Sequence, residues 1–245
     1  MNLVSKIERD NYLSALVSCL ECKSFKNVQF VVCPPFIHLE AWAKKVTDLR
    51  ISLGAQNIHQ EASGRFTGEI SAPMVKSFGG EYVIIGHSER REHFNESDEA
   101  INKKIKIALK NNLVPVICIG ETEAQRNAGE IRQVILTQLV EGLRDIPKAK
   151  IYQVVIAYEP VWAIGSGRIP TNDEIMEARI LMQKTLSDKF GLSLEKMPRI
   201  IYGGSVNFRN VKDICFEAGM QGALVGGESL HPKDFIKIGE VLENN

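Results

Sequence analysis

Residues 157–167 read Ala-Tyr-Glu-Pro-Val-Trp-Ala-Ile-Gly-Ser-Gly, and the fold is best predicted from this stretch outward. The apolar run 154–158 that leads into it is typical of a strand buried on both faces. The strand ends at Glu159, and Pro160 holds that carboxylate in extended backbone rather than in a helix. With a tryptophan and two glycines, residues 161–167 are interpreted as a lid over a ligand. The alternative is an ordinary strand-end glutamate beside a βα loop.

Short apolar runs like this one alternate with helical patterns along the whole chain. The predicted strands are 28–33, 51–55, 82–86, 114–119, 153–158, 199–203 and 222–226. Apolar residues recur at helical spacing over 13–20, 101–109 and 175–186, and a capping box starting at Thr171 precedes the last. Apolar strands separated by helices predict a parallel sheet covered by helices, either a barrel or a doubly wound sheet. No low-complexity linker divides the chain, so we expect one domain, 1–245.

The charge balance argues against polymer partners. Thirty basic and thirty acidic residues give a formal net charge of zero, which leaves no electrostatic footprint for nucleic acid or for an anionic membrane surface. No apolar run approaches the roughly 18 residues that span a bilayer, and the start of the chain lacks a signal peptide. We therefore expect a cytoplasmic protein.

The cysteines predict reduced thiols and no metal. They lie at positions 19, 22, 33, 118 and 215, an odd number in a chain large enough to need no disulfides. Cys19 and Cys22 form a C-x-x-C pair, but the pair falls at the end of a predicted helix and has no second pair to complete a zinc site.

Polar and glycine residues gather where the predicted strands end, the edge at which such folds bind ligands. His87 follows one strand directly and is a candidate acid or electrophile, and Glu159 ends another. Gly203-Gly204-Ser205 and Gly226-Gly227 follow the last two strands, where backbone N–H groups could hold a phosphate; the alternative is a pair of glycine turns. No dinucleotide-binding fingerprint supports a nicotinamide cofactor.

These motifs give the chain a close resemblance to the triosephosphate isomerase family, nearly end to end and in the family's order. The motifs are Gly86 to Arg91, Ala157 to Gly167, Tyr202 to Val206, Leu224 to Gly227, Gly54 to Asn57 and Phe66 to Glu69. The resemblance implies a (β/α)8 TIM barrel of the α/β class. It also implies an isomerase of glycolysis and gluconeogenesis that interconverts dihydroxyacetone phosphate and D-glyceraldehyde 3-phosphate through an enediolate, without a cofactor.

The resemblance also implies roles for individual residues. Glu159 is expected to be the base that moves a proton between two substrate carbons, and His87 the neutral imidazole that polarises the carbonyl. Four residues are expected to bind the substrate phosphate: Gly165, Ser205, Gly226 and Gly227. Thr67 is similar to the loop tip that inserts into a second subunit, which implies a homodimer.

The start of the chain departs from the family pattern. The family begins with a strand that ends in Asn-x-Lys, and Met1-Asn2 resembles the residues just after that lysine. We therefore expect a barrel with seven visible strands, without the first strand, and with two unpaired edges. Three alternatives follow: a start placed too late, a catalytically impaired or dead barrel, or a phosphate-binding lyase or synthase barrel. The last would have no evident reason to share the Glu-Pro-Val-Trp lid.

Overall fold

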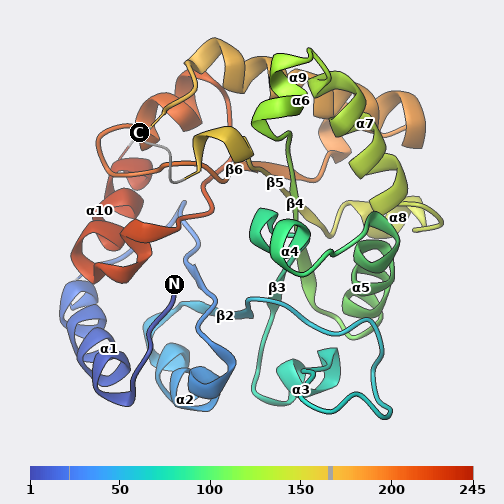
Figure 1. Ribbon diagram of the computed structural model, residues 1–245. Coiled ribbons are helices and arrows are strands. Elements are labelled where there is room, and N and C mark those ends of the chain that lie inside the picture. The colour runs from blue at the N-terminus through green and yellow to red at the C-terminus, as the bar shows by residue number, and fades with distance from the viewer. Residues whose placement is uncertain (22, 165–167, 245) are drawn as a thin grey trace.

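The computed structural model describes residues 1–21, 23–164 and 168–244, in which parallel strands form a curved sheet surrounded by helices (Figure 1). The strands are β1 (Val31–Val32), β2 (Ser52–Ala55), β3 (Tyr82–Ile85), β4 (Val114–Ile119), β5 (Val155–Tyr158) and β6 (Arg199–Tyr202). The α-helices are α1 (Lys6–Leu20), α2 (Leu39–Leu49), α3 (Ala72–Ser77), α4 (Ser88–His93), α5 (Asp98–Lys110), α6 (Glu123–Asn127), α7 (Ile131–Gly142), α8 (Lys148–Ile151), α9 (Asn172–Phe190) and α10 (Pro232–Glu243). Short 3₁₀ turns cover Phe36–His38, Val161–Ala163, Leu194–Lys196 and Gly227–Leu230, and Asp213–Glu217 is a π-helical turn.

The sheet follows chain order, β1-β2-β3-β4-β5-β6, and every neighbouring pair is parallel. Four of its strands are aligned at one level: Ile85 pairs with Ile117, Ile117 with Ile156, and Ile156 with Ile200. The residues three positions further along these strands therefore share one level at the carboxyl edge. Sequential parallel strands joined by helices confirm the expected α/β barrel class.

The seventh predicted strand is shorter in the structure than in the prediction. Of residues 222–226, only Ala223 forms a parallel bridge, and its partner is Tyr202 of β6. Gly222 has a φ of 150°, which departs from strand geometry, and Gly226 follows closely. The predicted strand 28–33 is likewise reduced to Val31–Val32. Both shortened segments face each other across the open side of the sheet.

The central strands β3, β4 and β5 are largely buried on both sides, which explains why their sequences are apolar throughout. On the inner side, Tyr82, Val116 and Val155 belong to one cluster. On the outer side, Ile117 and Ile156 belong to a larger cluster with the helices. Full burial of such side chains stabilises the fold by about 1.5–3 kcal/mol each. The two clusters therefore fix the direction in which each strand presents its carboxyl end.

Helix α9 illustrates how local sequence sets an element. Thr171 accepts a hydrogen bond from the Glu174 N–H, and the Glu174 carboxylate accepts one from the Thr171 N–H, so the predicted capping box is formed. Gly191 ends the helix with a φ of 63°.

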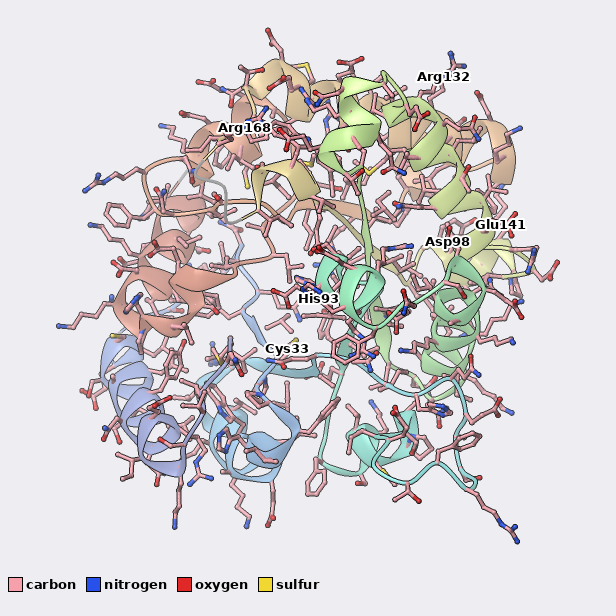
Figure 2. The ribbon with its side chains drawn as sticks, viewed as in Figure 1. Cys33, His93, Asp98, Arg132, Glu141 and Arg168 are labelled. Carbon is pink, nitrogen blue, oxygen red and sulfur yellow. The ribbon has the colours of Figure 1, made fainter. Side chains whose placement is uncertain are left out.

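On the outer surface of the ring, Arg132 and Glu141 of α7 point away from the sheet (Figure 2). Within the described ranges, no helix is both long and apolar enough to cross a bilayer.

Candidate active site

The strand register brings four chain segments together at one level of the carboxyl edge. Tyr158 of β5 pairs with Ile119 of β4 and with Tyr202 of β6. Glu159 is therefore flanked by the residues that follow those strands, Gly120 and Gly203. The Ser88 segment after β3 also reaches this level.

Glu159 is held at this level with its two carboxylate oxygens in different environments. Its side chain is only 2% exposed. The Oε2 atom accepts a hydrogen bond from the backbone N–H of Ser88 at 3.0 Å. The Oε1 atom lies 3.2 Å from Nε2 of His87, but it accepts no well-formed hydrogen bond from any residue in the described ranges. One oxygen is thus anchored and the other is left available beside the histidine.

The His87 ring is oriented by the start of α4. His87 is the N-cap of this helix, and its Nδ1 accepts a hydrogen bond from the backbone N–H of Glu89 at 3.4 Å. A ring nitrogen that accepts carries no proton, so in this arrangement Nε2 carries the ring N–H. That N–H faces the Glu159 side, and the His87 side chain is 28% exposed, which leaves it open to a ligand.

The surroundings of Glu159 make it a stronger base than an exposed glutamate. Burial raises the pKa of its carboxyl. His87, the Ser88 N–H and the Cys118 thiol act in the opposite direction and offset part of this shift. A carboxylate with a raised pKa and one unbonded oxygen is suited to accept a proton from carbon. The residues predicted from the sequence as an acid–base pair are therefore brought together, while their roles remain predictions.

Two glycines make room for this carboxylate; the sequence analysis assigned Gly120 no role and placed Gly203 in a candidate phosphate-binding stretch. A Cβ atom at Gly120 would lie 1.8 Å from the Glu159 carbonyl oxygen. A Cβ atom at Gly203 would lie 2.8 Å from Cγ of Glu159. Real Cβ atoms do not approach so closely, so both neighbours must be glycine for Glu159 to hold its position. In the sequence, the feature that could have pointed to these two glycines is their position directly after strands β4 and β6.

Cys118 also neighbours the carboxylate from the inner face of β4. Its thiol is fully buried, and burial together with the nearby Glu159 raises its pKa well above the usual value. A thiol with a raised pKa is a weak nucleophile at neutral pH. Cys118 therefore contributes packing and a weak polar contact, as the predicted set of reduced cysteines allows. The described cysteines form no disulfide.

The predicted phosphate-binding residues follow the bridge between Tyr202 and Ala223. Ser205 and Gly226 each lie three residues beyond that bridge, which places both loops at the same rim. Gly226 and Gly227 are exposed, and a Cβ atom at either would meet no other atom within 4 Å. Backbone N–H groups at these glycines are therefore open to an anion. Gly165, the fourth predicted residue, lies outside the described residues.

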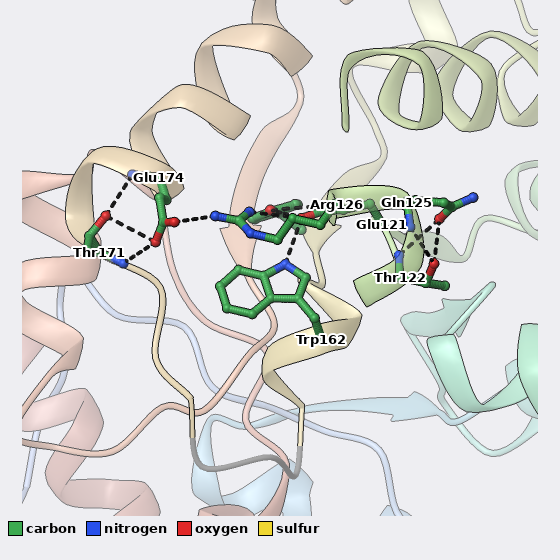
Figure 3. Close-up of polar contacts among 8 residues, drawn as sticks. Glu121, Thr122, Gln125, Arg126, Trp162, Thr171 and Glu174 are labelled. Carbon is green, nitrogen blue, oxygen red and sulfur yellow. Dashed lines mark hydrogen bonds and ion pairs between the residues drawn. The ribbon is translucent and has the colours of Figure 1, made fainter. Parts of the chain in front are cut away.

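The base of the predicted lid rests on a buried glutamate, as Figure 3 shows. Glu121 is 0% exposed and accepts hydrogen bonds from Nε1 of Trp162 at 2.7 Å and from the Tyr158 hydroxyl at 3.1 Å. The Arg126 guanidinium lies 3.4 Å from Glu121 and stacks 4.1 Å above the Trp162 ring. Arg126 also pairs with Glu174, so the lid base is tied to α6 and α9.

A cavity of about 930 Å³ opens at this rim and continues into the ring. His87, Gln56, Asn57 and Cys33 are among the residues that line it. Of these, Cys33 lies toward the centre of the molecule (Figure 2). The volume of the cavity is within the range of small-molecule sites. The described residues contain no group of three or more histidine, cysteine or carboxylate side chains placed to hold a metal ion.

The predicted subunit-contact loop stands away from the ring. Residues 59–71, between β2 and α3, extend beyond the helices in Figure 1. Thr67 at the tip is exposed, and Phe66 is 43% exposed although it stacks on His59 at 4.2 Å. Phe94, at the end of α4, is 66% exposed. Exposed aromatic residues of this kind are typical of protein interfaces.

Comparison with known proteins yields one consistent family. The triosephosphate isomerase family profile matches residues 2–242. The triosephosphate isomerase of Alkaliphilus oremlandii (strain OhILAs) is 43% identical over 239 residues, which is 97% of this chain and 94% of that protein. The triosephosphate isomerase of Dictyoglomus turgidum is 43% identical over 213 residues, 87% of this chain and 86% of that protein. The triosephosphate isomerase of Caldanaerobacter subterraneus subsp. tengcongensis is 45% identical over 210 residues, 86% of this chain and 85% of that protein.

Proposed function

Since the chain belongs to the triosephosphate isomerase family, we propose that Glu159 and His87 are the catalytic pair of this isomerase. The reaction interconverts dihydroxyacetone phosphate and D-glyceraldehyde 3-phosphate. The observation that supports the assignment is the free Oε1 atom of Glu159, which lies 3.2 Å from Nε2 of His87, a residue that lines the cavity. No other buried carboxylate in the described residues combines an unbonded oxygen with a facing imidazole.

The two side chains divide the proton transfer between them. Oε1 of Glu159 removes a proton from C1 of dihydroxyacetone phosphate, and the C–H electron pair forms the C1–C2 double bond of an enediolate. The C2 carbonyl electrons move onto oxygen, where the Nε2–H of His87 stabilises the charge by hydrogen bonding. The proton of the C1 hydroxyl is then transferred to the C2 oxygen, protonated Glu159 returns its proton to C2, and the oxygen on C1 becomes the aldehyde carbonyl. The raised pKa of Glu159 makes both halves of this exchange accessible.

The glycine loops hold the other end of the substrate. Ser205 and the N–H groups of Gly226, Gly227 and Gly165 are proposed to bind the phosphate dianion. Anchoring the phosphate fixes C1 and C2 against Glu159, and this positioning contributes to catalysis. The enediolate would lose phosphate in water, so we propose that residues 161–167 close over it, with Trp162 and its buried partner Glu121 at the base of the lid.

The pair can be tested by isotope exchange. With dihydroxyacetone phosphate in D2O, the unmodified enzyme should release glyceraldehyde phosphate that carries deuterium at C2. Glu159→Gln should lower kcat by about 10²- to 10⁴-fold and abolish this exchange, with KM nearly unchanged. The matched control is Glu123→Gln, an exposed carboxylate on α6, which should behave as the parent. Exchange that survives in Glu159→Gln would show that another residue is the base.

The phosphate loop has its own test. Gly227 has open space where a side chain would stand, so Gly227→Val can fold while covering the backbone N–H groups. We expect weaker competitive inhibition by inorganic phosphate and a higher KM, with kcat changed less. Inhibition equal to that of the parent would remove Gly227 from the phosphate site. The family assignment favours this isomerase over the lyase or synthase that a phosphate site alone would allow.

The remaining proposals concern the setting of the enzyme. We propose that it works in the cytoplasm, in glycolysis and gluconeogenesis, that residues 1–245 form one domain, and that the protein is a homodimer.

The exposed Thr67 loop and Phe94 support the dimer. Light scattering should give twice the chain mass, and Thr67→Arg should shift it toward one chain mass while the matched surface variant Thr137→Arg does not. A parent protein of one chain mass at micromolar concentration would contradict the dimer.

A further inference from the structure

The residue that follows strand β4 is bound by a side chain from another element. Gly120 donates its backbone N–H to Oε1 of Gln138 at 2.8 Å, and Nε2 of Gln138 donates to the Gly120 carbonyl oxygen at 3.2 Å. The opposite orientation of the amide would bring two donors together and two acceptors together, so only this orientation satisfies both contacts. One side-chain amide thus clamps both polar backbone groups of Gly120.

The clamp takes the place of a neighbouring strand. Val114 of β4 donates its N–H to the Glu81 carbonyl, on the β3 side. Because the direction of the backbone groups alternates along a parallel strand, those of Gly120 face the same side. Strand β3, however, ends at Ile85, and the chain then turns into α4. Within the described ranges, Gln138 is the only hydrogen-bond partner of the Gly120 backbone, and it supplies the donor and acceptor that a longer β3 would have supplied.

A second side chain serves the same side of β4 two residues earlier. Arg91 of α4 donates from Nη2 to the Cys118 carbonyl at 3.3 Å and from Nε to the Gly86 carbonyl at 3.0 Å. Arg91 therefore joins the ends of β3 and β4 below the level of Gly120. The position of Gly120 itself depends on Gln138.

Gln138 is carried by a helix that is fixed by its own packing. It lies on α7, and its neighbours on the same face, Ile135 and Leu139, are 0% and 1% exposed in the main apolar cluster. A polar group on such a helix can hold a backbone segment more precisely than one on a loop. Gln138 is not among the described residues that line the cavity, so any effect on a bound substrate is indirect.

The clamped residue lies directly against the backbone of Glu159. Glu159 donates its N–H to the Ile119 carbonyl at 2.7 Å, and Val161 donates to the Glu121 carbonyl at 3.1 Å. These two carbonyls belong to the residues on either side of Gly120. A Cβ atom at Gly120 would lie 1.8 Å from the Glu159 carbonyl oxygen, which leaves no space between the two backbones. A displacement of Gly120 would therefore move the backbone that carries the Glu159 carboxylate.

From these contacts we propose that Gln138 is a positioning residue for the Glu159 carboxylate, an inference that rests on the proposed function. Gln138 holds Gly120, and Gly120 sets where the carboxylate stands relative to the substrate carbons. A displacement near 1 Å can slow a reaction by about a hundredfold, so loss of the clamp should lower kcat. The alternative is a clamp that stabilises the fold and leaves the reaction unaffected.

The first test removes the clamp with little change in side-chain size. Gln138→Met loses both hydrogen bonds, and we expect kcat to fall about tenfold or more while inhibition by inorganic phosphate stays as in the parent. Gln138→Glu keeps the acceptor for the Gly120 N–H and should lower kcat less. Circular dichroism checks both variants, and the milder one decides the matter if Gln138→Met does not fold.

The matched control removes a second amide clamp on the same helix. Asn102 is 3% exposed and donates to the carbonyls of Gly142 and Arg144, both at 2.9 Å, at the C-terminal end of α7. Asn102→Leu should lower Tm, as Gln138→Met does, because each change removes two hydrogen bonds to backbone. It should nevertheless keep the kcat of the parent, since it lies away from Gly120.

A double variant tests whether Gln138 acts through Glu159. If the clamp matters because it places the carboxylate, Gln138→Met should cause little further loss of kcat in a protein that already carries Glu159→Gln. Amide exchange followed by NMR checks the clamp without reference to activity. The Gly120 N–H should exchange about tenfold faster in Gln138→Met, with the Val116 N–H in the middle of β4 unchanged.

The outcomes separate this inference from the proposed function. Parent-like kcat in folded Gln138→Met, an equal loss of kcat in Asn102→Leu, a full further loss in the Glu159→Gln background, or unchanged exchange at Gly120 would each overturn the positioning role and leave Glu159 as the proposed base. Parent-like kcat in Glu159→Gln alone would overturn the proposed base, and the role of Gln138 with it.

Discussion

A Cβ atom at Gly120 would stand 1.8 Å from the carbonyl oxygen of Glu159, so the residue after strand β4 must be glycine for Glu159 to take its place after strand β5. On the other side, a Cβ atom at Gly203 would stand 2.8 Å from Cγ of Glu159, so the residue after strand β6 must also be glycine for the Glu159 side chain to keep its position. The Glu159 carboxylate, the proposed base, is thus positioned by the absence of two side chains and by the Ser88 N–H that anchors its Oε2. Activity should therefore depend on groups that never touch the substrate.

Gly203→Ala should lower kcat by about tenfold to a hundredfold, because its methyl group must displace the Glu159 side chain and a shift near 1 Å is enough for such a loss. The added Cβ meets the flexible Cγ of Glu159 first, so the fold should be retained. Steady-state kinetics with circular dichroism checks this. The control is Gly142→Ala in α7, where the Cβ meets its nearest atom at 3.8 Å. Parent-like kcat in a folded Gly203→Ala would contradict the positioning role.

The pKa of Glu159 predicts that stability falls as pH rises. Burial raises the folded-state pKa of this carboxyl above its unfolded value, so in the window between the two values the folded state binds more protons. Its favourable contribution is complete below the unfolded pKa and is lost as pH passes the folded pKa. Glu159→Gln removes this loss, and it should raise Tm at pH 7 while matching the parent near pH 4. Calorimetry at both pH values checks this, and an unchanged or lower Tm at pH 7 would contradict it.

Activity should change with pH in the opposite direction. Glu159 must be ionised to accept the C1 proton, so kcat is expected to fall as pH drops through its raised pKa. The carboxylate that limits stability at neutral pH is thus the one that activity requires. A pH–rate profile with an acid limb above the ordinary glutamate range is the expected result, and a limb at the ordinary value would show that substrate binding removes the burial effect.

Lys104 and Glu96 form a buried ion pair behind the His87 segment. Burial disfavours the charged form of both groups. It lowers the pKa of Lys104. For Glu96, the ion pairs with Lys104 and Arg90 outweigh burial and keep the pKa of its carboxyl below the usual range. Glu96 also accepts the Gly86 N–H at 3.2 Å, next to His87. Lys104→Met should cost about 3–5 kcal/mol, because it leaves Glu96 buried with only Arg90 as a charged partner.

A double-mutant cycle measures that coupling by urea unfolding. Glu96→Gln combined with Lys104→Met should be less destabilised than the sum of the single variants, since neither charge is then left alone. Lys103→Met is the control, because its pair with Glu99 is exposed and should contribute little. Additive single effects would show that the pair is not coupled.

The sequence predicted the elements whose signals are local. The run 114–119 is β4 residue for residue, and the capping box at Thr171 starts α9, because strand propensity and end capping need few distant contacts. The ends of 28–33 and 222–226 were overestimated, since pairing depends on a neighbouring strand that local sequence does not reveal. Glu159 and His87 were identifiable from their place at strand ends.

The supporting residues could not be found in the same way. Glu121 follows β4 in the sequence, yet its partners Trp162 and Tyr158 come from β5 and the lid, and only the strand register brings them together. The role of Gly120 could not be predicted from its neighbours in the sequence, because the atom it avoids belongs to a residue 39 positions away. Contacts set by register rather than by spacing are the part of the site that the sequence did not disclose.

Trp162→Phe should weaken the base of the proposed lid while leaving the proposed catalytic pair, Glu159 and His87, in place. The change removes the Nε1 donor to buried Glu121 and leaves that carboxylate with Tyr158 and Arg126. A hydrogen bond to a charged group contributes about 1.5–3 kcal/mol, so Tm should fall. On the proposed closure of residues 161–167, this contact belongs to the lid base, so we also expect kcat to change more than the affinity for inorganic phosphate. Trp42→Phe, in a buried cluster distant from the lid, should lower Tm without altering kcat. If Trp162→Phe loses stability but keeps the kcat of the parent, the Glu121 contact supports the fold alone and does not govern the lid.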